Sequence, residues 1–123
     1  MASSYAYLAV GSVVGGFARY FLSTHVQKLV GFTFPYGTLC VNLIGCFLIG
    51  CMAGAKNGFL TTTDGRMLLV VGFCGAFTTF SAFMLETTAL CDSGQALRAL
   101  AYVVASVVAG FLLFRFGASL TAL

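Results

Sequence analysis

Four long stretches without a charged residue divide this chain, and their lengths constrain its fold more than any other feature of the sequence. A helix that crosses the hydrocarbon core of a bilayer needs about 20 mostly apolar residues. The stretches cover residues 1–18, 29–55, 67–85 and 99–114, and each is close to one span. The sequence therefore predicts an all-α membrane protein with four transmembrane helices, near residues 4–24, 34–56, 66–91 and 95–120.

The scarcity of charge excludes the soluble classes of protein. Of 123 residues, 60% are hydrophobic and 7% are charged, whereas an ordinary soluble domain has roughly 45–50% and 25%. A net charge of +3 spread over the chain forms no basic face, so no nucleic-acid partner is expected. No set of nucleophile, base and metal ligands is visible, and we do not expect an enzyme. Without a linker or repeat, residues 1–123 form a single domain.

Four spans put both termini on one side of the membrane, and the basic residues divide evenly between the two sides. The side of the termini holds Lys56, Arg66 and Arg115, and the opposite side holds Arg19, Lys28 and Arg98. Because an excess of Lys and Arg normally marks the cytoplasmic side, an even count permits insertion in both orientations. Two copies could then pair antiparallel and line a pathway that one bundle cannot form. The alternative is a single orientation, fixed by something that the count does not capture.

The second span contains a polar side chain near its middle, Asn42, one helical turn after Thr38. A polar side chain within hydrocarbon must find a partner or line a cavity. The Asn42 amide offers a neutral hydrogen-bond donor that can meet an anion. The alternative is a hydrogen bond from Asn42 to a neighbouring helix.

The third span contains a weak point for a helix. In the run GFCGAFTTFS, at residues 72–81, glycines and β-branched threonines lower helix propensity at mid-span. A break there frees backbone carbonyls that can coordinate a cation. In an antiparallel dimer two such breaks could meet and share one ion. The alternative is a continuous helix whose threonine hydroxyls bond to the preceding turn.

Aromatic rings follow the predicted break. Phe80, Phe83 and Glu86 are spaced by three residues and therefore project to one broad face of the helix. The positive edge of a phenylalanine ring can face an anion without the full charge that would trap it. Core packing is the commoner reason for two phenylalanines at this spacing, so both readings stay open.

Two other spans add candidate polar groups. Tyr102 and Ser106 share one face of the fourth span, and a Ser106 hydroxyl that does not bond to its own helix can donate to the same pathway. Arg19, near the end of the first span, can snorkel to the membrane interface or raise the anion concentration at the mouth of a pathway.

Together these residues resemble the Fluc, or CrcB, family of small fluoride channels over essentially the whole chain. Three blocks carry the resemblance: GGFARY at residues 15–20, PYGTLCVNLIG at residues 35–45 and GFCGAFTTFSAF at residues 72–83. The resemblance implies a passive channel that exports cytoplasmic fluoride, built as an antiparallel homodimer with two pores around a structural sodium ion. It also implies a multi-pass protein of the inner, or plasma, membrane of a prokaryote.

The resemblance assigns roles by position. Gly75 and Thr78 match the residues whose backbone carbonyls hold sodium in the family. Asn42 matches its pore asparagine, and Phe80 and Phe83 match its two pore phenylalanines. The side chains that match positions near the ion path are Thr38, Ser81, Glu86, Tyr102 and Ser106, and Arg19 matches the family's arginine in the first helix. Two hydroxyls of the family pattern are missing, since this chain has Ala82 and Met84.

A second class of function is a proton-coupled small multidrug-type exporter, which also has four spans and pairs antiparallel. Such exporters carry a carboxylate in the first helix and usually tryptophan. Here the first span has no Asp or Glu, the chain has no Trp, and Glu86 is the only predicted intramembrane carboxylate. A structural subunit is a third reading, and it would leave Asn42 and the predicted break without a joint purpose.

Overall fold

Helices account for nearly the whole chain in the computed structural model, which describes residues 1–122. Three helices are long and continuous: α1 (Ala2–Val30), α2 (Tyr36–Gly54) and α6 (Ala96–Thr121). The region between α2 and α6 is divided into η1 (Phe59–Thr61), α3 (Thr63–Gly65), η2 (Arg66–Cys74), α4 (Gly75–Phe77) and α5 (Phe80–Asp92). No strand occurs within the described residues. The predicted all-α fold with four helical regions is confirmed.

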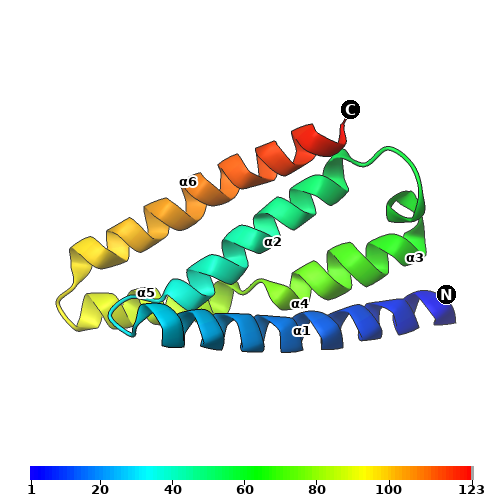
Figure 1. Cartoon of the computed structure of the whole chain (residues 1–123). Coiled ribbons are helices and arrows are strands. Elements are labelled where there is room, and N and C mark those ends of the chain that lie inside the picture. The colour runs from blue at the N-terminus through cyan, green and yellow to red at the C-terminus, as the bar shows by residue number, and fades with distance from the viewer. Residues whose placement is uncertain (123) are drawn as a thin grey trace.

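The four regions form two packed pairs with both termini at one end of the molecule (Figure 1). The helices α2 and α6 lie side by side, and α1 packs chiefly against η2, with smaller contacts to α2 and α4. Near the N-terminus, the Ser4 hydroxyl donates to Asp64 Oδ1 at 2.7 Å, and near the C-terminus Lys56 Nζ donates to Ala122 O at 2.7 Å. Both termini therefore meet the segment that joins α2 to η2.

Three regions are long and apolar enough to cross a membrane: α2, Thr63–Asp92 and α6. The first helix is also long, but the three basic or titratable side chains of its second half, Arg19, His25 and Lys28, make it more polar. It continues beyond the predicted end near residue 24, because no glycine or proline lies between residue 24 and Gly31, where φ is 117°. Arg19 therefore lies well inside α1, and its predicted position near the end of the helix is wrong.

Glycines let the helices approach until backbones touch. A Cβ atom added to Gly15 of α1 would overlap the carbonyl oxygen of Phe73, and one added to Gly50 of α2 would overlap that of Phe114 in α6. Such close approach is typical of small residues in membrane helices, where van der Waals packing replaces the hydrophobic effect. The two glycines thus hold α1 on η2 and α2 on α6.

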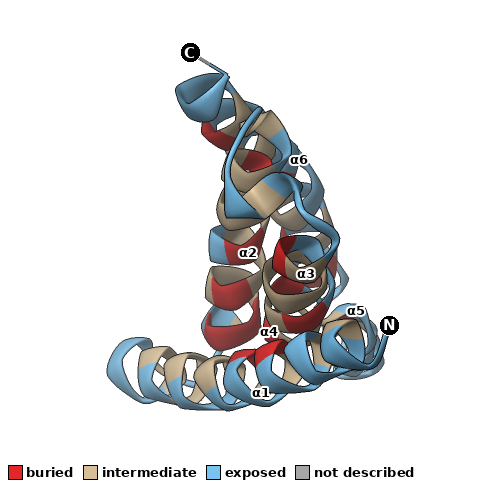
Figure 2. Ribbon diagram, turned by 90° about the vertical axis from the view of Figure 1, so that its right-hand side faces the viewer, coloured by how far each residue is buried: buried red, intermediate tan, exposed pale blue. Residues whose placement is uncertain are grey.

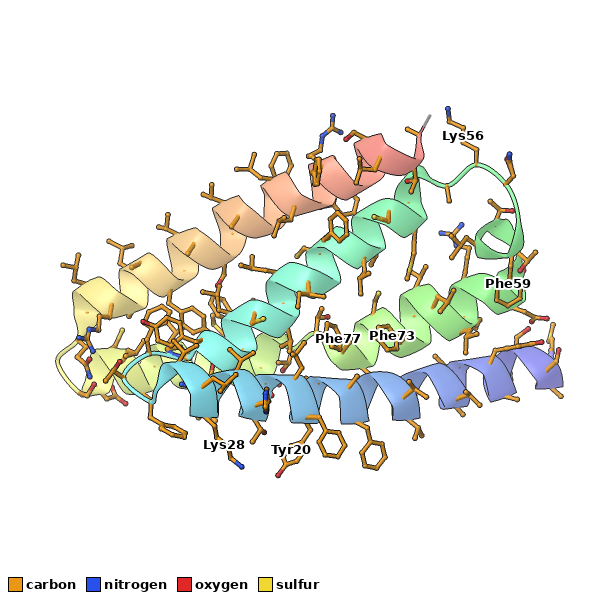
Figure 3. The ribbon with its side chains drawn as sticks, in the orientation of Figure 1. Tyr20, Lys28, Lys56, Phe59, Phe73 and Phe77 are labelled. Atoms are coloured by element: carbon orange, nitrogen blue, oxygen red, sulfur yellow. The ribbon has the colours of Figure 1, made fainter. Side chains whose placement is uncertain are left out.

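The helical region that precedes the break is wound differently from the prediction. The nine residues Arg66–Cys74 form a π-helix, a wider turn that occurs often at functional sites. Phe73 at its end and Phe77 in α4 stack at 5.4 Å, with ring planes 13° apart (Figure 3). At the start of the region, the Thr62 hydroxyl accepts the Gly65 N–H at 3.0 Å. The neighbouring Asp64 accepts a hydrogen bond from Ser4.

Buried residues gather where the helices face one another, and exposed residues lie along their outer sides (Figure 2). Many of the exposed residues are large and apolar. In α1 only Gly11 and Gly15 are buried. Phe17 and Phe111 lie exposed on the outer faces of α1 and α6. Apolar surface of this extent suits contact with lipid tails and not with water. The fold is therefore that of a multi-pass membrane protein.

A matched pair of glycines tests the packing of α1. Gly15→Ala should lower the free energy of unfolding by about 1–3 kcal/mol, the usual cost of overpacking, because its Cβ meets the Phe73 backbone. Gly16→Ala is the control, since a Cβ there has no neighbour within 4 Å and alanine favours a helix. Thermal unfolding in detergent compares the two variants. Equal shifts of the unfolding midpoint would contradict the contact.

Candidate functional site

The predicted break in the third helical region is present and involves two residues. Thr78 and Thr79 have extended backbones, with φ and ψ of −92° and 158° at Thr78 and −150° and 119° at Thr79. The Thr79 hydroxyl then starts α5 by accepting the Ala82 N–H at 3.3 Å. The alternative of a continuous helix is therefore wrong.

Asn42 holds the break through both ends of its amide. Its Nδ2 donates to Thr79 O at 3.1 Å, and its Oδ1 accepts from Thr79 N at 2.8 Å. The interpretation of Asn42 as a bond between helices is confirmed. A side-chain NH₂ carries two protons, so one N–H of Asn42 remains for a ligand after this bond. We call this pair of bonds the Asn42–Thr79 brace.

The brace removes the helical partner of one carbonyl, and the start of α5 removes that of another. In a continuous helix Gly75 O would accept from Thr79 N, but that N–H donates to Asn42. Thr78 O would accept from Ala82 N, but that N–H donates to the Thr79 hydroxyl. Gly75 is exposed, and a Cβ there would meet nothing within 4 Å. The two carbonyls predicted to hold sodium are thus among the carbonyls that lose their usual donors at the break.

Glu86 is held by two hydroxyls from different helices. Thr38 Oγ1 donates to Glu86 Oε1 at 2.6 Å, and the Tyr102 hydroxyl donates to Glu86 Oε2 at 2.7 Å. Charge-assisted hydrogen bonds of this kind stabilise a carboxylate away from water. The three residues join α2, α5 and α6 beside the break. Thr38 therefore bonds to Glu86, while Asn42, one turn later on α2, bonds to Thr79.

The two phenylalanines after the break have different surroundings. Phe83 is 6% exposed and meets the fully buried Tyr102 edge to face, with ring centres 4.9 Å apart and planes at 82°. Phe80 is 73% exposed, although its ring centre lies only 5.8 Å from that of Phe83. Core packing thus accounts for Phe83, and Phe80 lies free on the surface of one chain.

Two hollows flank the break. We call the first the ring groove; it has a volume of about 320 Å³ and lies between α2, the broken region and α6. The predicted residues that line it are Asn42, Thr78, Phe80, Phe83 and Ser106. We call the second the arginine groove; it has a volume of about 550 Å³ and is lined by Arg19, Thr38, Ser81, Glu86 and others from α1, α2 and α5. Thr79 lines both hollows, so the break forms the wall between them.

Ser106 brings an unused hydrogen-bonding group to the ring groove. Its Oγ is buried and has no hydrogen-bond partner. A buried polar atom without a partner costs about 1–3 kcal/mol, so such atoms usually indicate a missing ligand or water. The expected alternative, a Ser106 hydroxyl bonded to its own helix, is not what the structure has. Ser106 is therefore free to donate into the ring groove.

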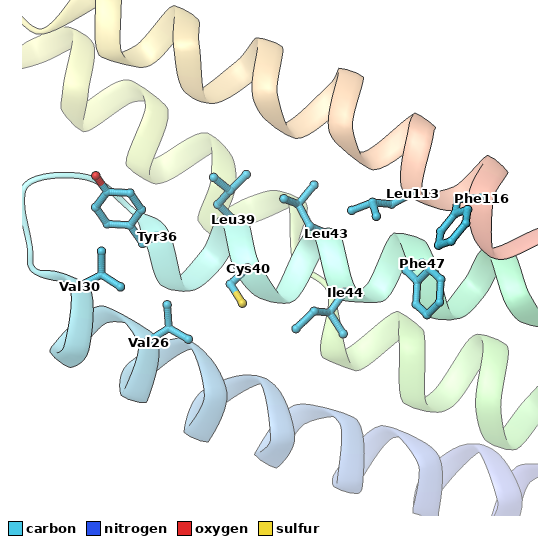
Figure 4. A pocket seen from close by; sticks show the side chains of 10 residues that line it. All are labelled: Val26, Val30, Tyr36, Leu39, Cys40, Leu43, Ile44, Phe47, Leu113 and Phe116. Carbon is cyan, nitrogen blue, oxygen red and sulfur yellow. The ribbon is translucent and has the colours of Figure 1, made fainter.

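A third hollow of about 600 Å³ lies on the outside of α2 and contrasts with the first two (Figure 4). Its lining is almost wholly apolar: Val26, Val30, Tyr36, Leu39, Cys40, Leu43, Ile44, Phe47, Leu113 and Phe116. A surface without hydrogen-bond donors cannot replace the water around an ion. This outer groove is therefore unsuited to an ion, and the polar residues predicted for a pathway line the two hollows beside the break instead.

Sequence reasoning missed two residues of the site. The sequence pattern places Thr79 only within the break. In the structure its backbone bonds to Asn42, its hydroxyl starts α5, and it lines both grooves. Gln27 was not singled out, yet its amide closes the connection from α1 to α2 by bonding Gly31 O, Phe34 O and the Gly37 N–H. A glutamine near the end of a helix, before a short connection containing glycine and proline, was the signal available.

Known proteins have sequences similar to this chain. Residues 6–118 match the family described as CrcB-like protein, Camphor Resistance (CrcB). The chain is 44% identical over 101 residues to a Rhizobium etli protein named fluoride-specific ion channel FluC, covering 81% of each chain. It is 43% identical over 114 residues to a protein of that name from Nitratidesulfovibrio vulgaris, covering 92% of each. A third, from Chlorobium phaeobacteroides, is 42% identical over 117 residues, 94% of this chain and 91% of that protein.

The bond from Tyr102 to Glu86 can be tested by stability. Tyr102→Phe should lower the free energy of unfolding by about 1.5–3 kcal/mol, the usual value of a hydrogen bond to a charged group. Tyr20→Phe is the control, since Tyr20 is exposed and points away from the bundle (Figure 3). Urea unfolding in detergent measures both variants. A loss in Tyr20→Phe as large as that in Tyr102→Phe would show that the buried bond contributes nothing.

Proposed function

This chain belongs to the CrcB-like family, and on that premise we propose that it is a fluoride-specific ion channel. The observation that carries the proposal is the placement of Asn42, Phe80, Phe83 and Ser106 around one hollow beside a helix break. The relatives named as fluoride channels are similar over most of their own length. No chemical step is needed, so the protein is not an enzyme.

The ring groove suits an anion that must bind and leave again. Its donors are the spare Asn42 N–H, the Ser106 hydroxyl and the positive ring edges of Phe80 and Phe83. No side chain with a full positive charge lines it. Neutral donors replace part of the hydration shell of fluoride without holding the ion too tightly for conduction.

The arginine groove supports entry to the same path. Arg19 raises the local concentration of anions. Glu86 repels an anion less than a free carboxylate would, because Thr38 and Tyr102 donate hydrogen bonds to its oxygens. Ala82 lines this groove where the family pattern has a hydroxyl, and Ser81 keeps a hydroxyl there, whereas the Thr38 hydroxyl donates to Glu86. The path proposed here runs from the arginine groove past Thr79 into the ring groove.

The proposal includes a second, antiparallel copy and a structural sodium ion. Gly75 and Phe80 are exposed on one chain, although Phe80 borders the proposed path. A second copy would cover them and add its own break. Carbonyl oxygens are ligands that suit a hard cation, and Gly75 O and Thr78 O lack their helical donors. Sodium would be held by these two carbonyls and their counterparts, giving two pores around one ion.

The location that fits this function is the plasma membrane of a prokaryote. The relatives with matching sequences come from bacteria such as Rhizobium etli. There the channel would export fluoride passively, after HF crosses the membrane and ionises inside. Basic residues lie at both ends of the molecule, as Lys28 and Lys56 do in Figure 3, and this supports insertion in both orientations.

Efflux of fluoride from liposomes containing the purified protein tests the function. Fluoride should leave without a proton gradient, and chloride efflux should be negligible. Equal efflux of both anions would contradict selectivity. Efflux that requires a proton gradient would favour the exporter, for which Glu86 is the available carboxylate in the third region.

Two substitutions in the ring groove test the path. Asn42→Asp should suppress fluoride efflux, because a carboxylate cannot donate to Thr79 O and adds negative charge beside the anion. Phe80→Ile should reduce efflux by removing a ring edge while keeping apolar bulk. Phe17→Ile is the matched control, since Phe17 is an exposed phenylalanine of α1 outside the groove. Efflux at the wild-type rate in both groove variants would contradict the proposed path.

A further inference from the structure

Two cysteines line the ring groove, and the function proposed above uses neither of them. Cys46 comes from α2 and Cys74 from the end of η2. Cys46 follows Asn42 by one helical turn, so both side chains lie on the face of α2 that meets the groove. Cys74 directly precedes Gly75, and its carbonyl accepts the Thr78 hydroxyl at 2.9 Å. Both thiols are therefore within one turn of the residues that hold the break.

Each thiol has a defined position in the groove wall. The Cys46 sulfur lies 3.2 Å from where a Cβ on Gly110 would be, so it occupies the space that this glycine leaves on α6. Gly110 is one turn after Ser106, whose hydroxyl has no partner. Cys74 is 2% exposed, and its Sγ lies 4.0 Å from Met52 Sδ. The groove thus combines neutral donors with soft sulfur atoms on two of its walls.

Sulfur changes what the groove can bind. Thiols and thioethers prefer soft metal ions, whereas amide N–H and hydroxyl groups donate hydrogen bonds to an anion such as fluoride. A volume of about 320 Å³ is also several times the share of one water, which is about 30 Å³ in the liquid. A small organometallic cation therefore fits beside the anion donors.

We propose that the ring groove is a site for soft, thiophilic cations, with Cys46 and Cys74 as the reacting groups. With aqueous methylmercury the step is a substitution at mercury: a sulfur–mercury bond forms as the bond from mercury to its water ligand breaks, the S–H bond breaks, and the proton passes to bulk water. Neither sulfur nor mercury changes oxidation state. One methylmercury adds to each thiol, so no bridge between the two cysteines is required.

The adduct has a consequence for conduction, and this part rests on the proposed function. A mercury and a methyl group on Cys46 would occupy the space beside Asn42 and Ser106, where the anion passes. Fluoride efflux should therefore fall when the thiols react. Among the described residues, α5 contributes Phe80 and Phe83 to the lining of the groove and no cysteine.

The other cysteines provide internal controls. Cys91 is exposed at the end of α5, Cys40 lines the outer apolar groove, and the Cys51 sulfur lies 3.1 Å from where a Cβ on Gly117 would be. None of these three lines the ring groove. Reaction at Cys91 should leave fluoride efflux unchanged.

Mapping the adducts tests the site without any measurement of flux. The wild-type protein in liposomes is treated with methylmercury and digested, and the mass of each cysteine peptide is measured. Adducts on Cys46 and Cys74 support the site. Reaction of Cys91 while Cys46 and Cys74 stay unmodified overturns it, whether or not the protein conducts fluoride.

Flux then tests the link to conduction. Methylmercury should abolish most fluoride efflux in the wild type and in Cys91→Ser. The fraction of efflux that is lost should be much smaller in Cys46→Ser, and smallest in the double variant Cys46→Ser/Cys74→Ser. Inhibition of the double variant as strong as that of the wild type contradicts the proposal. If the untreated wild type conducts no fluoride, the proposed function fails, and the adduct map alone decides the site.

Discussion

The structure depends on one constraint, which is that a backbone N–H or C=O within hydrocarbon needs a partner. A break at Thr78 and Thr79 would leave such groups unpaired in mid-membrane, and the Asn42–Thr79 brace supplies two of the missing bonds. The brace also releases Gly75 O from its helical donor. A single amide on α2 thus permits the break, fixes its position against α2 and exposes a carbonyl for a further ligand.

The grooves follow from where the break lies. Because Thr79 lines both hollows, the same extended residues separate the arginine groove from the ring groove. Glu86, bonded by Thr38 and Tyr102, ties α5 to α2 and α6 on the far side of the break. The result is a rigid frame in which neutral donors face one hollow and the single arginine of α1 faces the other. This division of charge suits a path for an anion that must not be trapped.

Much of this arrangement could be predicted from the sequence, and the rest depends on packing. The spans followed from stretches without charge, and the break from Gly75, Thr78 and Thr79, because both signals are local. The charge-free stretches did not give the correct end of α1, since no residue between 24 and Gly31 stops a helix. The pairing of Asn42 with Thr79, and the burial of Phe83 but not Phe80, require the relative positions of α2, α5 and α6, which no local pattern contains.

The sodium content of the purified protein tests the central proposal, that the Asn42–Thr79 brace frees the Gly75 carbonyl to help hold a cation between two copies. The wild type and Asn42→Ala are transferred to sodium-free buffer, and the sodium that stays with the protein is measured by atomic emission. The account predicts that the wild type retains a sodium ion shared by a pair of chains and that Asn42→Ala loses it. Wild-type protein without sodium, or equal retention in both, would contradict the account.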